Sequence, residues 1–397
     1  MPVTPQNRTE VAAQTEEDLL GWRPAFPILE SSTYLISNSL GAMPRGVHEA
    51  LRHYAETWAT AGAMAWEKEW WLLAEQVADA VAPLIGAPAG SVSTHQNVTL
   101  ASAVVASCFE FDGDRTGIVC SDLNFPSIVH LYRQHERRGA RLHLVPSPDG
   151  LTVPTQAMID AIDESTLLVP ISHVIFKSSY MQDVEAIVQR AHAVGAYVVL
   201  DLYQSAGIMP IDVSRLQVDF AVGGMLKWLC GGPGSSYLYV RPDHTATLRP
   251  MITGWFARQN AFAFDPRDES WRSDAWRFLN GTTHIPSLSA ALPGLEILNQ
   301  LDLNAVRDKS VRQTQLLIDA ADENGWQVNS PRDCSRRAGH VTLGVPEAET
   351  VTAALLERRI MIDYRPGAGI RIAPHFYTTD QEILRAVEVM AELTTAS

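Results

Sequence analysis

The sequence predicts an α/β protein, in which a mainly parallel sheet flanked by helices forms a large domain and a smaller α+β domain follows at the C-terminus. Three observations support this fold class. Apolar strand-like runs alternate with helical periodicity between residues 72 and 240. The length of 397 residues suits one large domain with a smaller one attached. A composition of 46% hydrophobic and 19% charged residues is typical of a globular protein.

The predicted elements follow from these periodicities. Because strands and helices alternate, we expect a parallel sheet. Residues 250–284 are rich in aromatic residues and glycine, and we interpret them as a long functional loop region. The predicted strands are 91–94, 117–120, 141–145, 166–171, 196–200, 220–223 and 237–240, and the predicted helices are 46–61, 72–81, 98–109, 127–138, 184–194, 288–298 and 306–324.

We expect three parts along the chain. Residues 1–65 form an N-terminal segment that belongs partly to the small domain, residues 66–295 form the large domain, and residues 296–397 form the small α+β domain. No internal repeat or low-complexity tract interrupts them.

Charge and composition narrow the partners. A formal net charge of -14 disfavours nucleic acid and anionic membranes, and favours a small molecule. The four cysteines lie far apart without a CxxC pair, and the histidines are scattered, so we expect neither disulfides nor a metal site. The first twenty residues are polar and no run of about 18 apolar residues exists, so we predict a cytoplasmic protein without a signal peptide.

Two polar residues follow apolar segments and lie about 26 positions apart. Asp201 ends the apolar run 198–200, and ligands of open α/β sheets bind at such strand ends. Lys227 lies in the apolar and glycine-rich segment 220–234, where an unused lysine is costly. Singly, Asp201 could cap a helix and Lys227 could reach the surface. Together they predict a pyridoxal 5′-phosphate (PLP) site, because PLP needs a lysine for its Schiff base and an acid at its pyridine nitrogen.

Seven short motifs extend this interpretation along nearly the whole chain. They are Asn38-Ser-Leu-Gly41, Trp70 with Ala82-Pro-Leu-Ile-Gly86, Phe125-Pro-Ser127, Lys227-Trp-Leu-Cys-Gly-Gly-Pro-Gly234, Gly254-Trp-Phe256, Arg277-Phe-Leu-Asn-Gly-Thr282, and Gly369-Ile-Arg371-Ile-Ala-Pro374 followed by Tyr377. In this order they resemble kynureninase, a member of the aminotransferase class V group of fold-type I PLP enzymes. The fourth, fifth and sixth motifs are the most specific, since kynureninases share that trio.

The resemblance implies a role for each matching position. It gives Lys227 the Schiff base and Asp201 the pyridine nitrogen, and it gives Arg371 the substrate carboxylate, which a guanidinium binds at two points. It also implies a homodimer, because two of the cofactor contacts come from the partner subunit. The remaining implied cofactor contacts are Gln96, Asn97, Phe125, Ser127, Ser172 and Gln204, with Trp255 and Thr282 reaching the partner's site, and the remaining implied substrate contacts are Asn38 and Trp70.

Four positions depart from the kynureninase pattern. Ile128 replaces an aspartate beside the cofactor ring, and Gln204 replaces the histidine of the family's Asp-Leu-Ala-His-Ser motif. Leu226 replaces a tyrosine that contacts the phosphate and relays protons, and Ala63 falls near a ring-contacting position. An amide and an aliphatic side chain cannot serve as acid or base. The early steps at Cα survive these changes, and the later hydrolytic steps are the ones affected.

Several functions remain open. The leading hypothesis is a kynureninase-like enzyme that cleaves a bond at Cβ of a bulky or aromatic L-amino acid through a Cα carbanion. A C–S or other β-elimination lyase and a decarboxylating deaminase are the alternatives, and a non-catalytic scaffold is the alternative from another class. Cysteine desulfurase lacks support because residues 360–370 contain no cysteine, and an epimerase would need a second base opposite Lys227.

Overall fold

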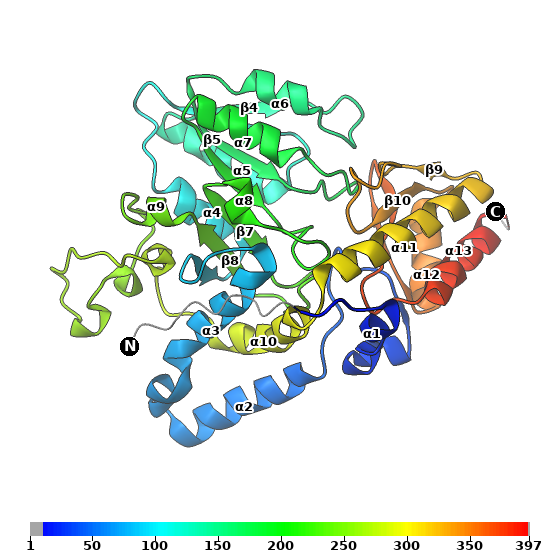
Figure 1. Ribbon diagram of the computed structural model, residues 1–397, viewed down its shortest axis with the longest axis horizontal. Helices are drawn as coiled ribbons and strands as arrows, with labels where there is room; N and C mark the ends of the chain where they lie inside the picture. The colour runs from blue at the N-terminus through cyan, green and yellow to red at the C-terminus, as the bar shows by residue number, and fades with distance from the viewer. Residues whose placement is uncertain (1–10, 396–397) are drawn as a thin grey trace.

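The computed structural model describes residues 11–395 and contains three sheets, of which the largest has seven strands (Figure 1). The strand order is β2-β8-β7-β6-β5-β3-β4. Its strands are β2 (Val92–His95), β3 (Gly117–Ser121), β4 (Arg141–Val145), β5 (Thr166–Ser172), β6 (Tyr197–Asp201), β7 (Phe220–Gly224) and β8 (Ser236–Val240). Each predicted strand is present, with bounds shifted by one residue at most.

The sheet is mainly parallel, as predicted, and β8 is the exception. Strands β7, β6, β5, β3 and β4 pair in parallel, whereas β8 is antiparallel to both β7 and β2. The chain returns from β7 to β8 through residues 225–235, a segment with no helix. A parallel crossover normally needs a dozen or more residues and a helix, so this short return reverses the strand. The same return carries Lys227.

Helices cover the sheet on its two faces, as Figure 1 shows. Strands β3, β5, β7 and β8 are buried along their whole length, which explains their almost uninterrupted apolar sequences. The helices of the large domain are α3 (Trp71–Val81), α4 (Val98–Ala106), α5 (Pro126–Gln134), α6 (Thr155–Ala161), α7 (Val184–Ala193), α8 (Val213–Leu216), α9 (Pro242–Thr245) and α10 (Ile285–Asn299).

The C-terminal part forms a second layer of strands with its own core. Helix α11 (Leu303–Glu323) runs from the large domain to this part (Figure 1). The four-stranded sheet is antiparallel, in the order β12-β13-β10-β9. The elements of this part are β9 (Gln327–Val328), β10 (Val341–Gly344), α12 (Ala348–Glu357), β12 (Asp363–Arg365), β13 (Gly369–Ile372) and α13 (Asp380–Thr395).

Helix α12 spans Ala348–Glu357 and packs against α13, which closes this second core.

The N-terminal segment contacts both parts of the molecule. It contains α1 (Glu16–Leu20), β1 (Thr33–Tyr34) and α2 (Gly46–Ala61). Strand β1 pairs in parallel with β11 (Ile360–Met361) of the C-terminal part, whereas α2 packs along α10 of the large domain. The predicted domain limits at residues 65 and 295 remain a prediction. Residues 1–10 lie outside the described residues, and they are half of the polar stretch from which we predict that the protein has no signal peptide.

The region 250–284 has no long helix or strand, as predicted. It contains three short 3-10 helices, Trp255–Ala257, Ala261–Ala263 and Ala275–Phe278. Several helices differ from their predicted bounds or were not predicted, and α10 and α6 are examples. Helix α10 begins at Ile285 and continues through Pro293, and the seven-residue α6 is too short for its periodicity to identify it.

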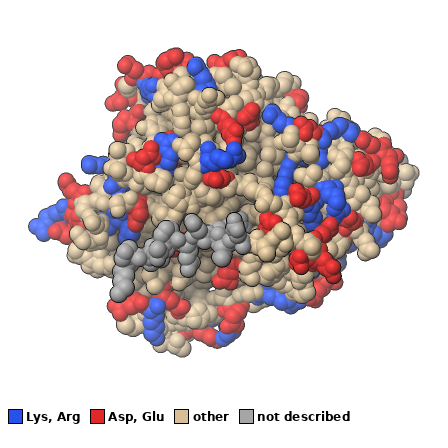
Figure 2. Space-filling view, in the orientation of Figure 1, with Lys and Arg blue, Asp and Glu red and all other residues tan. Residues whose placement is uncertain are grey.

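Within residues 11–395, no helix is long and apolar enough to cross a membrane. The same described range holds no group of three or more His, Cys, Asp or Glu residues that could bind a metal ion. All four cysteines are free thiols. On the face shown in Figure 2, basic side chains lie among acidic ones.

Candidate active site

Lys227, Asp201 and Arg371 line one cavity of about 280 Å³. Ser172 ends β5, Asp201 ends β6, and Lys227 follows β7 by three residues. The cavity therefore lies where neighbouring parallel strands end, which is where open α/β sheets bind ligands. Other residues in its wall are Asn38, Phe125, Phe176, Tyr203, Gln204, Leu226 and Arg365.

The N-terminal turn Asn38–Gly41 fixes the backbone of the lysine segment. The Gly41 amide donates to the Leu226 carbonyl at 2.8 Å. A Cβ atom at position 41 would lie 2.1 Å from the Lys227 carbonyl oxygen, so only glycine permits this approach. The motif at residues 38–41 is thus explained by close backbone packing against the lysine.

Burial shifts the pKa values of Lys227 and Asp201 in opposite directions. Loss of water lowers the pKa of Lys227 and raises that of Asp201, because burial disfavours the charged form of each. Each group partly offsets the shift of the other, and Arg371 lowers the lysine pKa further. The backbone amide of Tyr203 donates to Asp201 Oδ1 at 2.9 Å and stabilises its carboxylate. Lys227 is therefore an amine that loses its proton easily.

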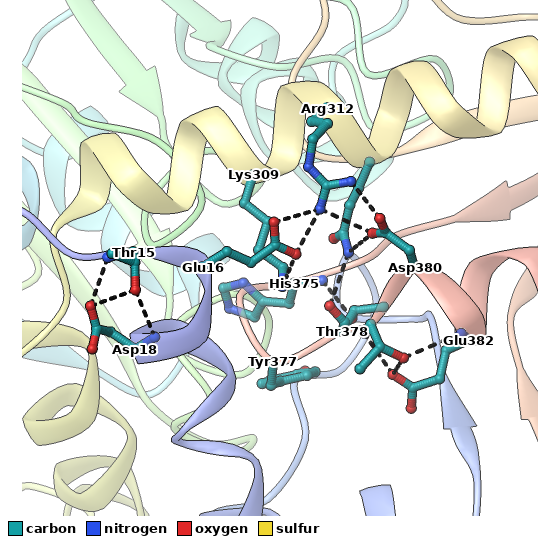
Figure 3. Close-up of polar contacts among 12 residues, drawn as sticks. Thr15, Glu16, Asp18, Lys309, Arg312, His375, Tyr377, Thr378, Asp380 and Glu382 are labelled. Atoms are coloured by element: carbon teal, nitrogen blue, oxygen red, sulfur yellow. Dashed lines mark hydrogen bonds and ion pairs between the residues drawn. The ribbon is translucent and has the colours of Figure 1, made fainter.

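A second buried lysine has a different environment. The Lys309 side chain is 2% exposed, but its Nζ lies 3.1 Å from a carboxylate oxygen of Glu16. Figure 3 shows that Glu16 also pairs with Arg312, which in turn pairs with Asp380, so this lysine belongs to an ion-pair network joining α1, α11 and α13. Lys309 thus holds elements together, whereas Lys227 faces the cavity.

The residues around the cavity fit PLP. Helix α4 begins beside β2, and Asn97 caps it by accepting from the Leu100 amide at 2.9 Å. Near this helix start the buried Thr94 Oγ1 and Gln96 Oε1 atoms have no hydrogen-bond partner among the described residues. A helix N-terminus with adjacent unpaired polar groups suits a phosphate. Because the Asn97 side chain is used by the cap, its contact with a phosphate would come from its backbone amide.

The other predicted cofactor contacts lie around the same cavity or at its border. Phe125, Ser172 and Gln204 line it, and the half-buried Ser127 lies in the first turn of α5. The Gln204 amide donates to the Asn38 carbonyl at 2.9 Å and its oxygen accepts from the Trp228 indole at 3.1 Å. Gln204 is therefore held in place, with one amide N–H left for the cofactor.

Arg371 is buried in β13, and its guanidinium already has two hydrogen-bond partners, Asp363 and Phe176. It donates to both carboxylate oxygens of Asp363, from Nε at 2.8 Å and from Nη2. It also donates from Nη1 to the Phe176 carbonyl at 2.6 Å. One N–H remains on each terminal nitrogen, which is the pair of donors that a substrate carboxylate needs.

Six predicted residues do not line this cavity: Gln96, Asn97 and Ser127, described above, and Trp70, Trp255 and Thr282. Trp70 is buried, with its ring against Tyr54 and Trp66, so the packing does not support a contact with the substrate. Trp255, in the region 250–284, packs against Trp71 of α3, and Thr282 of the same region is exposed. The neighbours of Thr282, including Gly281, line a small cavity together with Gln96 of the same chain. Their contact with a partner subunit remains a prediction.

Sequence reasoning missed three residues of the site, which are Tyr203, Phe176 and Asp363. Tyr203 lines the cavity beside Lys227, and its signal was the replacement of alanine in the Asp-Leu-Ala-His-Ser motif. Asp363 pairs with Arg371. The sequence pointed to it only through its short spacing to Arg365, whose guanidinium also lies 3.0 Å from the Asp363 carboxylate. The aromatic wall is formed by Phe125, Phe176 and Tyr203 rather than by tryptophans.

Comparison with known proteins gives the same picture. Residues 33–385 match the family model for aminotransferase class V. Kynureninase from Pseudomonas fluorescens is 31% identical over 96% of this chain and 94% of its own. An uncharacterized aminotransferase, YcbU from Bacillus subtilis, is 31% identical over 94% and 97%. Among solved structures, the apo cysteine desulfurase from Thermococcus onnurineus NA1 aligns with a TM-score of 0.84 at 21% identity, covering 98% of this chain and all of its own.

A second solved structure is the cystine C-S lyase C-DES in complex with its reaction product cysteine persulfide, with a TM-score of 0.82 and 21% identity over 92% of this chain and 99% of its own. The solved structures share the fold of this chain, and the family match over residues 33–385 together with the kynureninase relative defines a PLP-dependent enzyme of fold type I. The family match is more specific, and the chain belongs to the aminotransferase class V family as a kynureninase-like member.

Proposed function

We propose that this enzyme cleaves a bond at Cβ of a bulky or aromatic L-amino acid, and that it does so by β-elimination. The observation that carries the proposal is the set of proton-active groups in the cavity wall. Burial lowers the pKa of Lys227 to about 8, whereas Leu226 beside it has no exchangeable proton. Elimination needs one base at Cα, which Lys227 provides, and a leaving group at Cβ, which the substrate itself carries.

Each remaining residue has a defined task in this scheme. When bound, PLP withdraws electrons from Cα, and Asp201 supports this by keeping the pyridine nitrogen protonated. Lys227 Nζ takes the proton from Cα. The two free N–H groups of Arg371 bind the α-carboxylate, and the side chain of the substrate lies against Phe176, which lines the same cavity. This arrangement favours an apolar or aromatic substituent on Cβ.

Hydrolysis of kynurenine is the second candidate. It is supported by the relative named kynureninase at 31% identity over nearly the full chain. Hydrolysis at the γ-carbonyl needs proton transfers beyond Cα, and the family's tyrosine for that relay is replaced by Leu226. Decarboxylating deamination has no supporting observation in the cavity.

A substrate screen of the holoenzyme tests the proposal. S-phenyl-L-cysteine and S-benzyl-L-cysteine report elimination through pyruvate, L-kynurenine reports hydrolysis through fluorescent anthranilate, and aromatic L-amino acids report decarboxylation through carbon dioxide. We expect the wild-type enzyme to release pyruvate from S-phenyl-L-cysteine and S-benzyl-L-cysteine, and we expect the Lys227→Ala variant to release none. Anthranilate without pyruvate would contradict elimination and establish hydrolysis. Leu226→Tyr then tests the relay directly, because we expect it to raise anthranilate formation.

The same enzyme is proposed to act as a homodimer. The region 250–284 exposes large apolar side chains, with Phe262 56% and Phe264 71% exposed. Met251 is 61% exposed on the same region. Exposed apolar side chains that gather in one region are typical of protein interfaces. Light scattering of the holoenzyme should give twice the mass of the chain, and a monomer would contradict the proposal.

A further inference from the structure

We propose that Tyr203 forms the second aromatic wall of the cofactor site, with its ring packed on the face of the pyridine ring opposite Phe125, and that Gly224 provides the space for it. The proposal concerns how this chain holds its cofactor, so it does not depend on which reaction follows.

The positions of the two rings around Lys227 are the first observation. Lys227 Nζ lies over the Tyr203 ring, 4.3 Å from its centre, and over the Phe125 ring, 5.7 Å from its centre. A cofactor attached through this nitrogen would have its ring between these two aromatic side chains. Asp201, the predicted partner of the pyridine nitrogen, accepts a hydrogen bond from the backbone amide of Tyr203. Tyr203 would therefore lie close to both the lysine and the aspartate that hold the cofactor.

The glycine under Tyr203 is the second observation. A Cβ atom at position 224 would lie 2.1 Å from Tyr203 Cζ and 2.2 Å from its hydroxyl oxygen. Gly224 ends the extended strand β7 and does not have a positive φ, so its backbone would accept any residue. Space for the Tyr203 ring is therefore the reason that this position requires glycine.

The Tyr203 side chain contacts both the core and the cavity. It is partly buried and packs against the apolar cluster that includes Phe220, Val222 and Leu238. It also lines the cavity that contains Lys227. A phenol ring that packs on the core and borders the cavity is suited to stack with a flat, electron-poor pyridine ring.

The affinity of the apoenzyme for PLP tests this proposal without any substrate. The variants are Tyr203→Phe, Tyr203→Ala, Gly224→Ala and the double variant with alanine at both positions, and the measurements are the dissociation constant of PLP and the absorption spectrum of the bound cofactor. We expect Tyr203→Phe to bind within about twofold of the wild type and Tyr203→Ala to bind about five- to tenfold more weakly, the size of a typical aromatic stacking contribution.

Gly224→Ala supplies the independent arm. Its methyl group should push the Tyr203 ring into the cofactor space and weaken PLP binding more than Tyr203→Ala does. Removing the ring in the double variant should restore binding to the level of Tyr203→Ala. Unchanged affinity in Tyr203→Ala, equal losses in Tyr203→Phe and Tyr203→Ala, or no recovery in the double variant would each overturn the proposal. If Gly224→Ala does not fold, the two Tyr203 variants decide.

Because PLP affinity is read before any substrate is added, a failed pyruvate assay would leave this result unaffected. Equally, the loss of this aromatic wall would leave the proposed elimination open to its own test.

Discussion

Asp363 and Arg371 face each other across the neighbouring strands β12 and β13, and their side chains form a two-point ion pair. The Arg371 side chain is 2% exposed and that of Asp363 is 13% exposed. A long side chain in a cavity normally samples many rotamers, and this pair restricts Arg371 to one of them. The arginine is therefore oriented before a substrate arrives.

We expect Asp363→Asn to weaken substrate binding more than turnover. The variant keeps an acceptor for Arg371 but loses the charge and one of the two acceptor oxygens. KM for the S-aryl cysteine that the screen identifies should rise about tenfold, with kcat changed much less, as expected when uniform binding is lost. Asp322→Asn, at the exposed pair with Arg332, is the matched control and should change neither constant. Equal KM values for Asp363→Asn and wild type would refute the positioning role.

Replacement of Asp201 should slow proton removal at Cα. In Asp201→Asn the pyridine nitrogen loses its acidic partner, so we expect the exchange of the Cα hydrogen of L-phenylalanine with deuterium to fall by about 10²–10³-fold, the size of a lost electrostatic contact in an active site. NMR follows this exchange directly. Asp201→Glu keeps the charge and should lose much less. Exchange at the wild-type rate in Asp201→Asn would show that Asp201 does not act on the cofactor.

The pKa of Lys227 can be read from how fast the apoenzyme captures PLP. Only the neutral amine reacts, and burial lowers the pKa of this lysine, so a larger neutral fraction exists at a given pH than for an exposed lysine. The capture rate should therefore rise with pH and level off below about pH 10, the range of an unperturbed lysine. Stopped-flow absorbance measures it. A rate that still rises steeply above that pH would mean that the pKa is not lowered.

Lys309 provides a control for the choice of lysine. Its ammonium is paired with Glu16, which also pairs with Arg312, so Lys309→Met removes one partner of a network and leaves the cavity untouched. We expect the variant to bind PLP as the wild type does and to lose at most about 2 kcal/mol of unfolding free energy, because Glu16 is partly exposed and keeps its second partner. PLP titration and chemical denaturation measure the two effects. If a folded Lys309→Met variant lost PLP binding, the assignment of the cofactor to Lys227 would be wrong.

Much of the fold was predictable because its signals are local. The apolar runs of β6 and β7 are visible in the sequence alone, and so are the costly polar residues at or after their ends, Asp201 and Lys227. The packing of Tyr203 on Gly224 was not, since it depends on the pairing of β6 with β7. The position of Trp70 depends in the same way on how α2 and α3 meet, so its motif could not show that the ring is buried away from the cavity.

The most direct test of the account is to locate the cofactor on the chain. Sodium borohydride reduction makes the bond between PLP and its lysine permanent, and peptide mass spectrometry then identifies the residue. The chain has four lysines, Lys68, Lys177, Lys227 and Lys309, so the assignment is unambiguous. We expect the phosphopyridoxyl mass on Lys227 alone and none in Lys227→Ala. Modification of another lysine, or none in the wild type, would contradict the account.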